Sequence, residues 1–81
     1  MWELIVNGAT LEVGNRLRYR IQEGEIEIVN ECEIIQTGEI YFCILTTKNN
    51  GVNIPEENQA TIKYSFSKLN QLGFERWVNN N

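Results

Sequence analysis

EIEIVNECEIIQ, at residues 25–36, is the stretch that decides the fold. Apolar residues alternate with glutamates along most of it, so that Ile26, Ile28 and Ile34 fall on one side and the glutamates on the other. A period of two residues is typical of a β-strand with one buried face and one solvated face. The stretch therefore predicts a long strand that forms the backbone of a small β-sheet.

The preceding segment, RLRYRIQ at residues 16–22, is predicted to pair with this strand. We expect residues 23–24 to form the two-residue loop of an antiparallel hairpin. This register sets two arginines against two glutamates on the outer face: Arg16 opposite Glu31 and Arg20 opposite Glu27. The charges and the apolar pattern thus favour the same pairing.

The following segment, IYFCILTT at residues 40–47, is predicted to pair with the other side of the long strand. A three-residue loop centred on Gly38 would place Ile34 opposite Phe42. The segment is apolar on both faces, whereas a single core covers only one. We expect the second face to be covered by the C-terminal segment or by a partner. The candidate partner-binding residues are Ile35, Tyr41, Cys43, Leu45 and Trp77.

The N-terminal segment carries a hairpin signature. Asn7-Gly8 can supply the two positive φ angles of a type I′ turn, which would join strands at residues 2–6 and 9–13. Glu3 would then face Glu12. We interpret this pair as a solvated surface, because the chain has no His or Asp to complete a carboxylate site.

The C-terminal part predicts a strand, a short helix and a last strand. ATIKYSF at residues 60–66 alternates as a strand, and Gly73 stands where a glycine ends a helix. FERWV at residues 74–78 is predicted to be the last strand, followed by a frayed tail at 79–81. One helix over residues 65–78 is the competing interpretation. The irregular segment 48–59 is long for a hairpin loop and is a second candidate binding region.

Together these elements predict one small β domain at residues 1–78, all-β or β-rich α+β. Short strands, tight turns and one short helix near the C-terminus are typical of an SH3-like or other partly open antiparallel barrel of five to seven strands. A domain of 81 residues can bury only a modest core, so oligomerisation would stabilise it.

The composition argues against most catalytic and metal chemistry. Without His, the chain lacks the usual general base, the usual partner of a nucleophilic Ser or Cys, and a common zinc ligand. Two cysteines are too few for a disulfide framework or a metal knuckle, and the glycines form no phosphate-binding loop. We therefore predict no enzyme, no cofactor and no metal. The lack of a long apolar run predicts no membrane span, and we expect a cytoplasmic protein.

Three hypotheses for the function follow. The first is a non-enzymatic protein-binding module, including an inhibitor, whose partner is another protein or a second copy of the chain. The second is a homo-oligomer that binds a small anionic metabolite or nucleotide at a subunit boundary through Arg18, Tyr19 and Arg20. The third is a barrel that binds RNA or single-stranded DNA through the same strand. A net charge of −4 argues against nucleic acid, because phosphate-backbone affinity comes from clustered cations.

Overall fold

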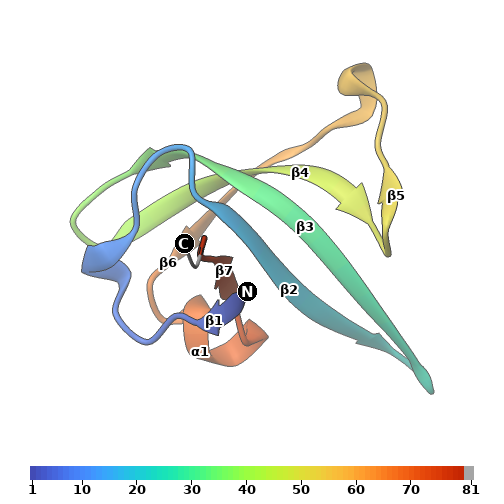
Figure 1. Cartoon of the computed structure of the whole chain (residues 1–81), viewed down its shortest axis with the longest axis horizontal. Helices are drawn as coiled ribbons and strands as arrows, with labels where there is room; N and C mark the ends of the chain where they lie inside the picture. Colours follow the sequence, from blue (N-terminus) through green and yellow to red (C-terminus); the bar gives the residue numbers. More distant parts are fainter. Residues whose placement is uncertain (80–81) are drawn as a thin grey trace.

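The computed structural model describes residues 1–79. One antiparallel sheet of seven strands bends around a core and stays open, with one short helix near the C-terminus (Figure 1). The predicted fold class, a partly open antiparallel β fold with a short C-terminal helix, is confirmed. The predicted tail at 79–81 lies outside the described residues except for Asn79.

Residues 1–79 form seven strands. They are β1 (Trp2–Leu4), β2 (Arg16–Glu23), β3 (Ile26–Thr37), β4 (Tyr41–Asn49), β5 (Val52–Asn53), β6 (Thr61–Ser65) and β7 (Glu75–Trp77). The helix α1 spans Lys68–Leu72, and two 3-10 turns, η1 and η2, span Gly8–Thr10 and Glu56–Asn58. The strand order is β1-β7-β2-β3-β4-β5, and β6 pairs with β4. The first and last strands are therefore neighbours at one edge of the sheet.

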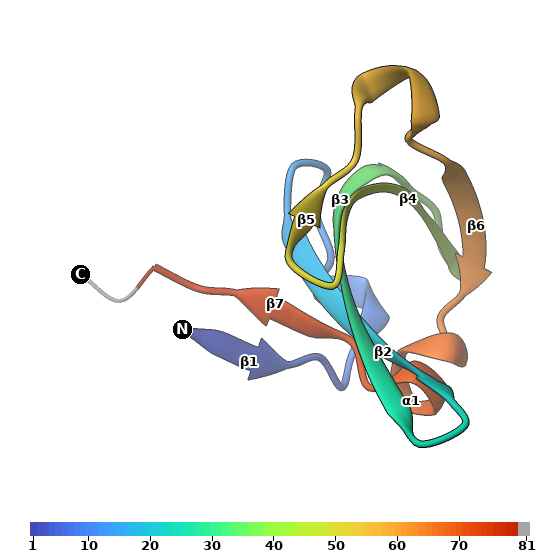
Figure 2. The same ribbon diagram turned by 90° about the vertical axis from the view of Figure 1, so that its right-hand side faces the viewer.

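The core lies on the inner face of β2, β3 and β4, and the C-terminal segment closes it. Its largest fully buried side chains are Leu17, Cys32, Ile34, Phe42, Ile44, Leu69 and Phe74. Figure 2 shows the curved β3–β4 pair facing β6, with α1 at the lower end. The C-terminal segment thus covers the inner face of β4. On the second apolar face of this strand, Cys43 is buried and Tyr41 and Leu45 are half-buried.

The helix α1 ends as the sequence predicts. Gly73 adopts the left-handed conformation (φ 62°), and the Phe74 N–H donates a hydrogen bond to the Leu69 carbonyl at 3.0 Å. These contacts turn the chain into β7, so the short helix and last strand are confirmed and the single helix over 65–78 is wrong. No helix within residues 1–79 is long and apolar enough to cross a membrane.

The β2–β3 register differs by two residues from the one predicted. The turn residues are Gly24 and Glu25, because Gly24 takes the positive φ (60°) that a type II′ turn needs at its first central position. As a result Ile21 opposes Ile28, and Arg16 opposes Glu33. A shift of two residues keeps every side chain on its predicted face.

The predicted β3–β4 register is also wrong. Ile34 opposes Ile44, and a β-bulge at Ile35 inserts one extra residue before Gln36 pairs with Cys43. A bulge reverses the alternation beyond it, so Gln36 shares the face of Cys43 and not that of Ile34. The alternation in the sequence gave no sign of this extra residue.

The predicted N-terminal hairpin does not form. The Asn7 side chain accepts a hydrogen bond from the Ala9 N–H (3.0 Å) and starts η1, while β1 pairs with β7. A second Asn-Gly pair does form such a turn: Asn50 and Gly51 have φ values of 50° and 84° and join β4 to β5. Part of the predicted irregular segment 48–59 is therefore a tight hairpin.

Candidate functional site

The two ends of the chain build an aromatic and cationic surface on the outer face of β1, β7 and β2. Trp2 opposes Trp77, and their rings meet edge to face with centroids 5.4 Å apart. The Arg16 guanidinium lies 5.1 Å from the Trp2 ring centroid and 5.5 Å from that of Trp77. Arg18 lies 4.5 Å from the Trp2 ring centroid. We call these four residues, with Leu4 beside them, the tryptophan surface.

The pairing of β1 with β7 explains why the indoles meet. The Met1 amino group donates to the Val78 carbonyl, and the Val78 N–H donates to the Met1 carbonyl, each at 2.8 Å. In an antiparallel ladder the neighbouring pair, Trp2 with Trp77, is then a non-hydrogen-bonded pair with closer side chains. Such an aromatic pair contributes about 0.5 to 1.5 kcal/mol beyond the burial of its surface.

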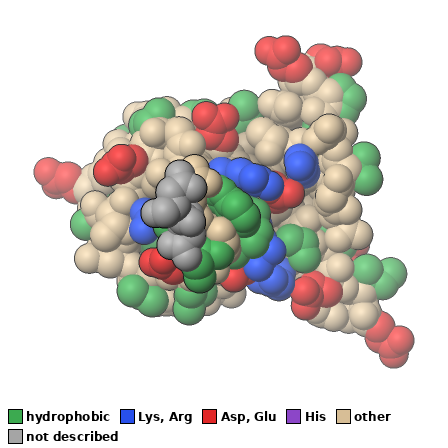
Figure 3. Space-filling model, in the orientation of Figure 1, with side chains coloured by type: hydrophobic (Ala, Val, Ile, Leu, Met, Phe, Trp, Pro, Cys, Tyr) green, Lys and Arg blue, Asp and Glu red, His purple; other side chains and the backbone are tan. Residues whose placement is uncertain are grey.

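The tryptophan surface is accessible to solvent. Trp77 is 39% exposed and Leu4 57% exposed. Figure 3 shows hydrophobic side chains over β1 and β7 with cationic side chains on both sides of them. A contiguous apolar surface of this kind, bordered by charge, is typical of an interaction site.

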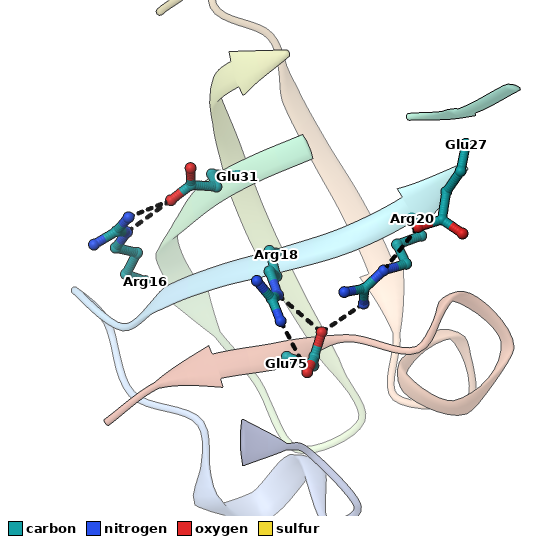
Figure 4. Close-up of polar contacts among 6 residues, drawn as sticks. All are labelled: Arg16, Arg18, Arg20, Glu27, Glu31 and Glu75. Carbon is teal, nitrogen blue, oxygen red and sulfur yellow. Dashed lines mark hydrogen bonds and ion pairs between the residues drawn. The ribbon is translucent and has the colours of Figure 1, made fainter. Parts of the chain in front are cut away.

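A network of ion pairs holds the arginines of β2 in place (Figure 4). Arg18 Nε donates to Glu75 Oε1 at 2.8 Å, and Arg20 also binds Glu75. The hydrogen bonds from Arg18 and then from Arg20 lower the pKa of Glu75 below its ordinary value, and the bond to Glu75 raises the pKa of Arg20. The strand β7 is thus tied to β2 directly beside the tryptophans.

Both ion pairs predicted for this face are confirmed. Arg16 Nε donates to Glu31 Oε1 at 2.8 Å, and Arg20 Nε donates to Glu27 Oε1 at 3.1 Å. They form diagonally across the hairpin rather than between directly opposed residues. Long arginine side chains reach the diagonal neighbour as readily as the opposite one.

The Glu75 network predicts a pH-dependent stability. Because the pKa of Glu75 is lowered in the folded state, its contribution is present above about pH 4.3, its unfolded pKa, and is lost as pH falls through the folded pKa. Glu75→Gln is therefore expected to lower the free energy of unfolding by about 1 kcal/mol at pH 7, a modest value because the network is partly solvated. Urea denaturation at pH 7 and pH 3 should show a larger difference between the two proteins at pH 7 than at pH 3. An equal change at both values, or a matching change in the exposed control Glu39→Gln, would contradict the role of the Glu75 charge.

A polar hollow of about 400 Å³ lies on the other face of the β1–β7 pair. Its lining residues are Glu3, Thr10, Glu12, Asn15, Arg76, Trp77, Val78 and Asn79. Arg76 Nη1 donates to the Thr10 carbonyl at 2.9 Å, which ties the end of η1 to β7. Glu3 and Glu12 line the same hollow, although the hairpin predicted to bring them together does not form.

The structure divides the predicted partner-binding residues between two places. Tyr41, Cys43 and Leu45 lie on β4, and Ile35 lies at the bulge of β3. The Tyr41 hydroxyl accepts a hydrogen bond from Gln36 Nε2 (3.1 Å), and Cys43 is only 8% exposed. Trp77, on β7, is separated from the residues of β4 by β2 and β3, and from Ile35 by β2. Of this set, Trp77 alone belongs to the tryptophan surface.

The predicted ligand-binding residues lie on opposite faces of β2. Tyr19 is 3% exposed in the core, with its ring centroid 4.8 Å from that of Phe74. Arg18 and Arg20 lie on the outer face and bind Glu75. The three side chains therefore do not share one pocket.

Few other side chains within residues 1–79 are chemically reactive. Burial raises the pKa of the Cys32 thiol to about 12, so this cysteine stays protonated at neutral pH. Both cysteines are free thiols. The described residues hold no group of three or more His, Cys, Asp or Glu side chains placed to bind a metal ion.

Sequence patterns did not single out Trp2, Leu4 and Arg16 as parts of the tryptophan surface, or Glu75 as the carboxylate that binds Arg18. Trp2 and Trp77 lie at opposite ends of the chain, and no local pattern shows that their strands pair. Comparison of the chain with protein-family models, curated protein sequences and solved structures finds no significant match.

Proposed function

We propose that the chain is a non-catalytic protein-binding module and that it binds through the tryptophan surface. The observation that carries the proposal is the pair of partly exposed indoles from the two chain ends, with the Arg16 and Arg18 guanidiniums close to their rings. Tryptophan and arginine are enriched among the residues that supply most of the binding energy at protein interfaces.

The ion pairs of β2 favour a protein partner over an anionic ligand. Arg16, Arg18 and Arg20 each already bind a glutamate of this chain. A phosphate or a nucleic-acid backbone would have to compete with these carboxylates. The same ion pairs fix the guanidiniums next to the indoles, and a surface held in place before binding loses less conformational entropy on binding.

Exposed apolar side chains of the N-terminal segment support the same location. Within the first 13 residues, the large exposed apolar side chains besides Leu4 are Met1, Val6 and Val13. A specific interface needs about 800 Å² on each partner, more than two indoles supply. Met1 and Val6, which lie close to β1 in the sequence, can provide part of the remaining contact area.

Selection from a random peptide display library tests the proposal. We expect enriched peptides whose affinity falls at least tenfold in Trp77→Ala, because a central tryptophan commonly contributes about 2 kcal/mol or more. The control is Val52→Ala, which truncates an exposed side chain on β5, away from the tryptophan surface. Enriched peptides that bind Trp77→Ala as tightly as the wild type, or a selection without enrichment, would contradict the proposal.

A further inference from the structure

The outer edge of β1 is open to another strand. Within residues 1–79, β1 has one strand neighbour, β7. Met1 pairs with Val78, and the Ile5 N–H donates to the Phe74 carbonyl at 3.0 Å, so the odd-numbered residues direct their backbone groups toward β7. The alternation of an antiparallel ladder then points the N–H and C=O groups of Trp2 and Leu4 to the open edge. Figure 2 shows β1 on the outside of the ribbon that it forms with β7.

A strand added at this edge would meet a different environment on each face. Its residues opposite Trp2 and Leu4 would lie on the outer face, beside the exposed leucine and the indoles. Apolar side chains are favoured at those two positions. Its residue opposite Glu3 would lie on the inner face, where the hollow is.

The hollow favours a cation at that middle position. Glu3 and Glu12 both line it, and within residues 1–79 neither of them forms an ion pair. The one cationic side chain in the lining, Arg76, already donates to Thr10. The charged side chains of the lining, two glutamates and one arginine, leave a net charge of −1, which a lysine or arginine side chain entering the hollow would balance.

Building on the proposed function, we propose that β1 accepts an extended segment of another protein by strand addition. The segment carries an apolar, basic, apolar sequence. Its two apolar residues pair with Trp2 and Leu4, and its basic side chain enters the hollow beside Glu3 and Glu12. Main-chain hydrogen bonds supply the part of the affinity that does not depend on the peptide sequence, and the hollow supplies the selectivity.

A second copy of the chain is a poorer occupant of this edge. Antiparallel pairing of two β1 strands about their centres would place Glu3 opposite Glu3 of the second copy. Like charges directly opposite each other destabilise a sheet. A foreign strand with a basic residue at that position has the opposite, favourable arrangement.

The direct test uses the peptide acetyl-Ser-Thr-Val-Lys-Val-Thr-Ser-amide in an NMR titration of the intact chain. We expect it to bind about fivefold more tightly than a peptide with norleucine in place of lysine, because exposed ion pairs contribute up to about 1 kcal/mol each. Combining Glu3→Gln with Glu12→Gln should remove the preference and leave the norleucine peptide unaffected. Equal binding of the two peptides to the wild type would overturn the role of the hollow.

Methylated peptides test the strand addition itself. N-methyl groups on the two valines would remove the donors that face β1, whereas an N-methyl group on the lysine faces away from it. Only the first change should abolish binding. The bound peptide should also slow hydrogen exchange of the Trp2 and Leu4 amides. Unchanged exchange, or equal loss with both methylated peptides, would overturn the strand addition.

The outcomes separate this inference from the proposed function. Some peptides could bind Trp77→Ala more weakly than the wild type, yet show an affinity that depends neither on backbone methylation nor on the lysine. Such a result would support the protein-binding module and contradict strand addition. If neither the designed peptide nor any library peptide binds, both proposals fail. Dimerisation that protects the Trp2 and Leu4 amides without peptide would assign the edge to a second copy and contradict the foreign segment.

Discussion

Replacing Phe74 with Ala is expected to lower the free energy of unfolding by about 3 to 5 kcal/mol. Phe74 is fully buried, and its ring centroid lies 4.8 Å from that of Tyr19 and 5.3 Å from that of Phe42. Truncation would leave a cavity where α1, β2 and β4 meet. A domain of this size is stable by only about 5 to 10 kcal/mol, so the substitution would remove a large part of its stability.

Urea denaturation followed by circular dichroism measures this effect, with Val52→Ala as the control. The control removes an exposed side chain and should change the stability by less than about 0.5 kcal/mol. Because Phe74 immediately precedes β7, its loss should also loosen Trp77 and broaden the resonances of both indoles. A loss of less than 1 kcal/mol in Phe74→Ala would show that the ring is not at the centre of the core.

Gly8→Ala is expected to lower the stability by about 2 kcal/mol. A Cβ atom on Gly8 would lie 2.3 Å from Cγ of the Phe66 ring, which packs against the core. The backbone at Gly8 does not have a positive φ, so the expected loss comes from the collision alone. The ring would have to leave its present position, in which it is stacked with Phe42 at 6.4 Å between centroids.

A double mutant identifies the collision as the cause. Phe66→Leu shortens the side chain beneath Gly8, so Gly8→Ala should be less harmful in that background than in the wild type. The two stability losses should therefore sum to more than the loss in the double mutant. Strict additivity in urea denaturation would mean that Gly8 is needed for another reason.

Gly8 also shows where sequence patterns stop being informative. Asn7-Gly8 and Asn50-Gly51 carry the same type I′ signature, yet only the second pair has positive φ at both residues. Turn propensity is local and weak, and the burial of Gly8 under Phe66 outweighs it. The sequence shows the same turn propensity at both sites. It does not show the long-range contact that makes their conformations differ.

The strands and their faces could be predicted, whereas most registers could not. Alternation follows from the pleat of a strand, so residues 16–22 and 25–34 present the faces that the sequence predicts, and the bulge reverses the alternation only beyond Ile34. The observed pairing differs from the predicted one by two residues between β2 and β3, and by two or three residues between β3 and β4, where a bulge lies at Ile35. The ion pairs of Arg16 and Arg20 survived the shift because long side chains reach diagonal partners.

The candidate site depends on contacts that no single-sequence pattern contains. Trp77 was expected to bind a partner, and Arg18 and Arg20 a ligand, but their place beside Trp2 and Glu75 results from the pairing of the first strand with the last. Pairing between strands at the two ends of one chain depends on the whole fold. An alternating apolar segment alone does not determine its neighbour.

The account depends on the tryptophan surface being open to a foreign protein in solution. Light scattering across a range of protein concentrations measures this directly, through the mass of the wild type and of Trp2→Ala. The account predicts the mass of one chain, 9.4 kDa, for both proteins at every concentration. A wild-type dimer that Trp2→Ala converts to monomer would show that the surface is an interface between copies, and would contradict the account.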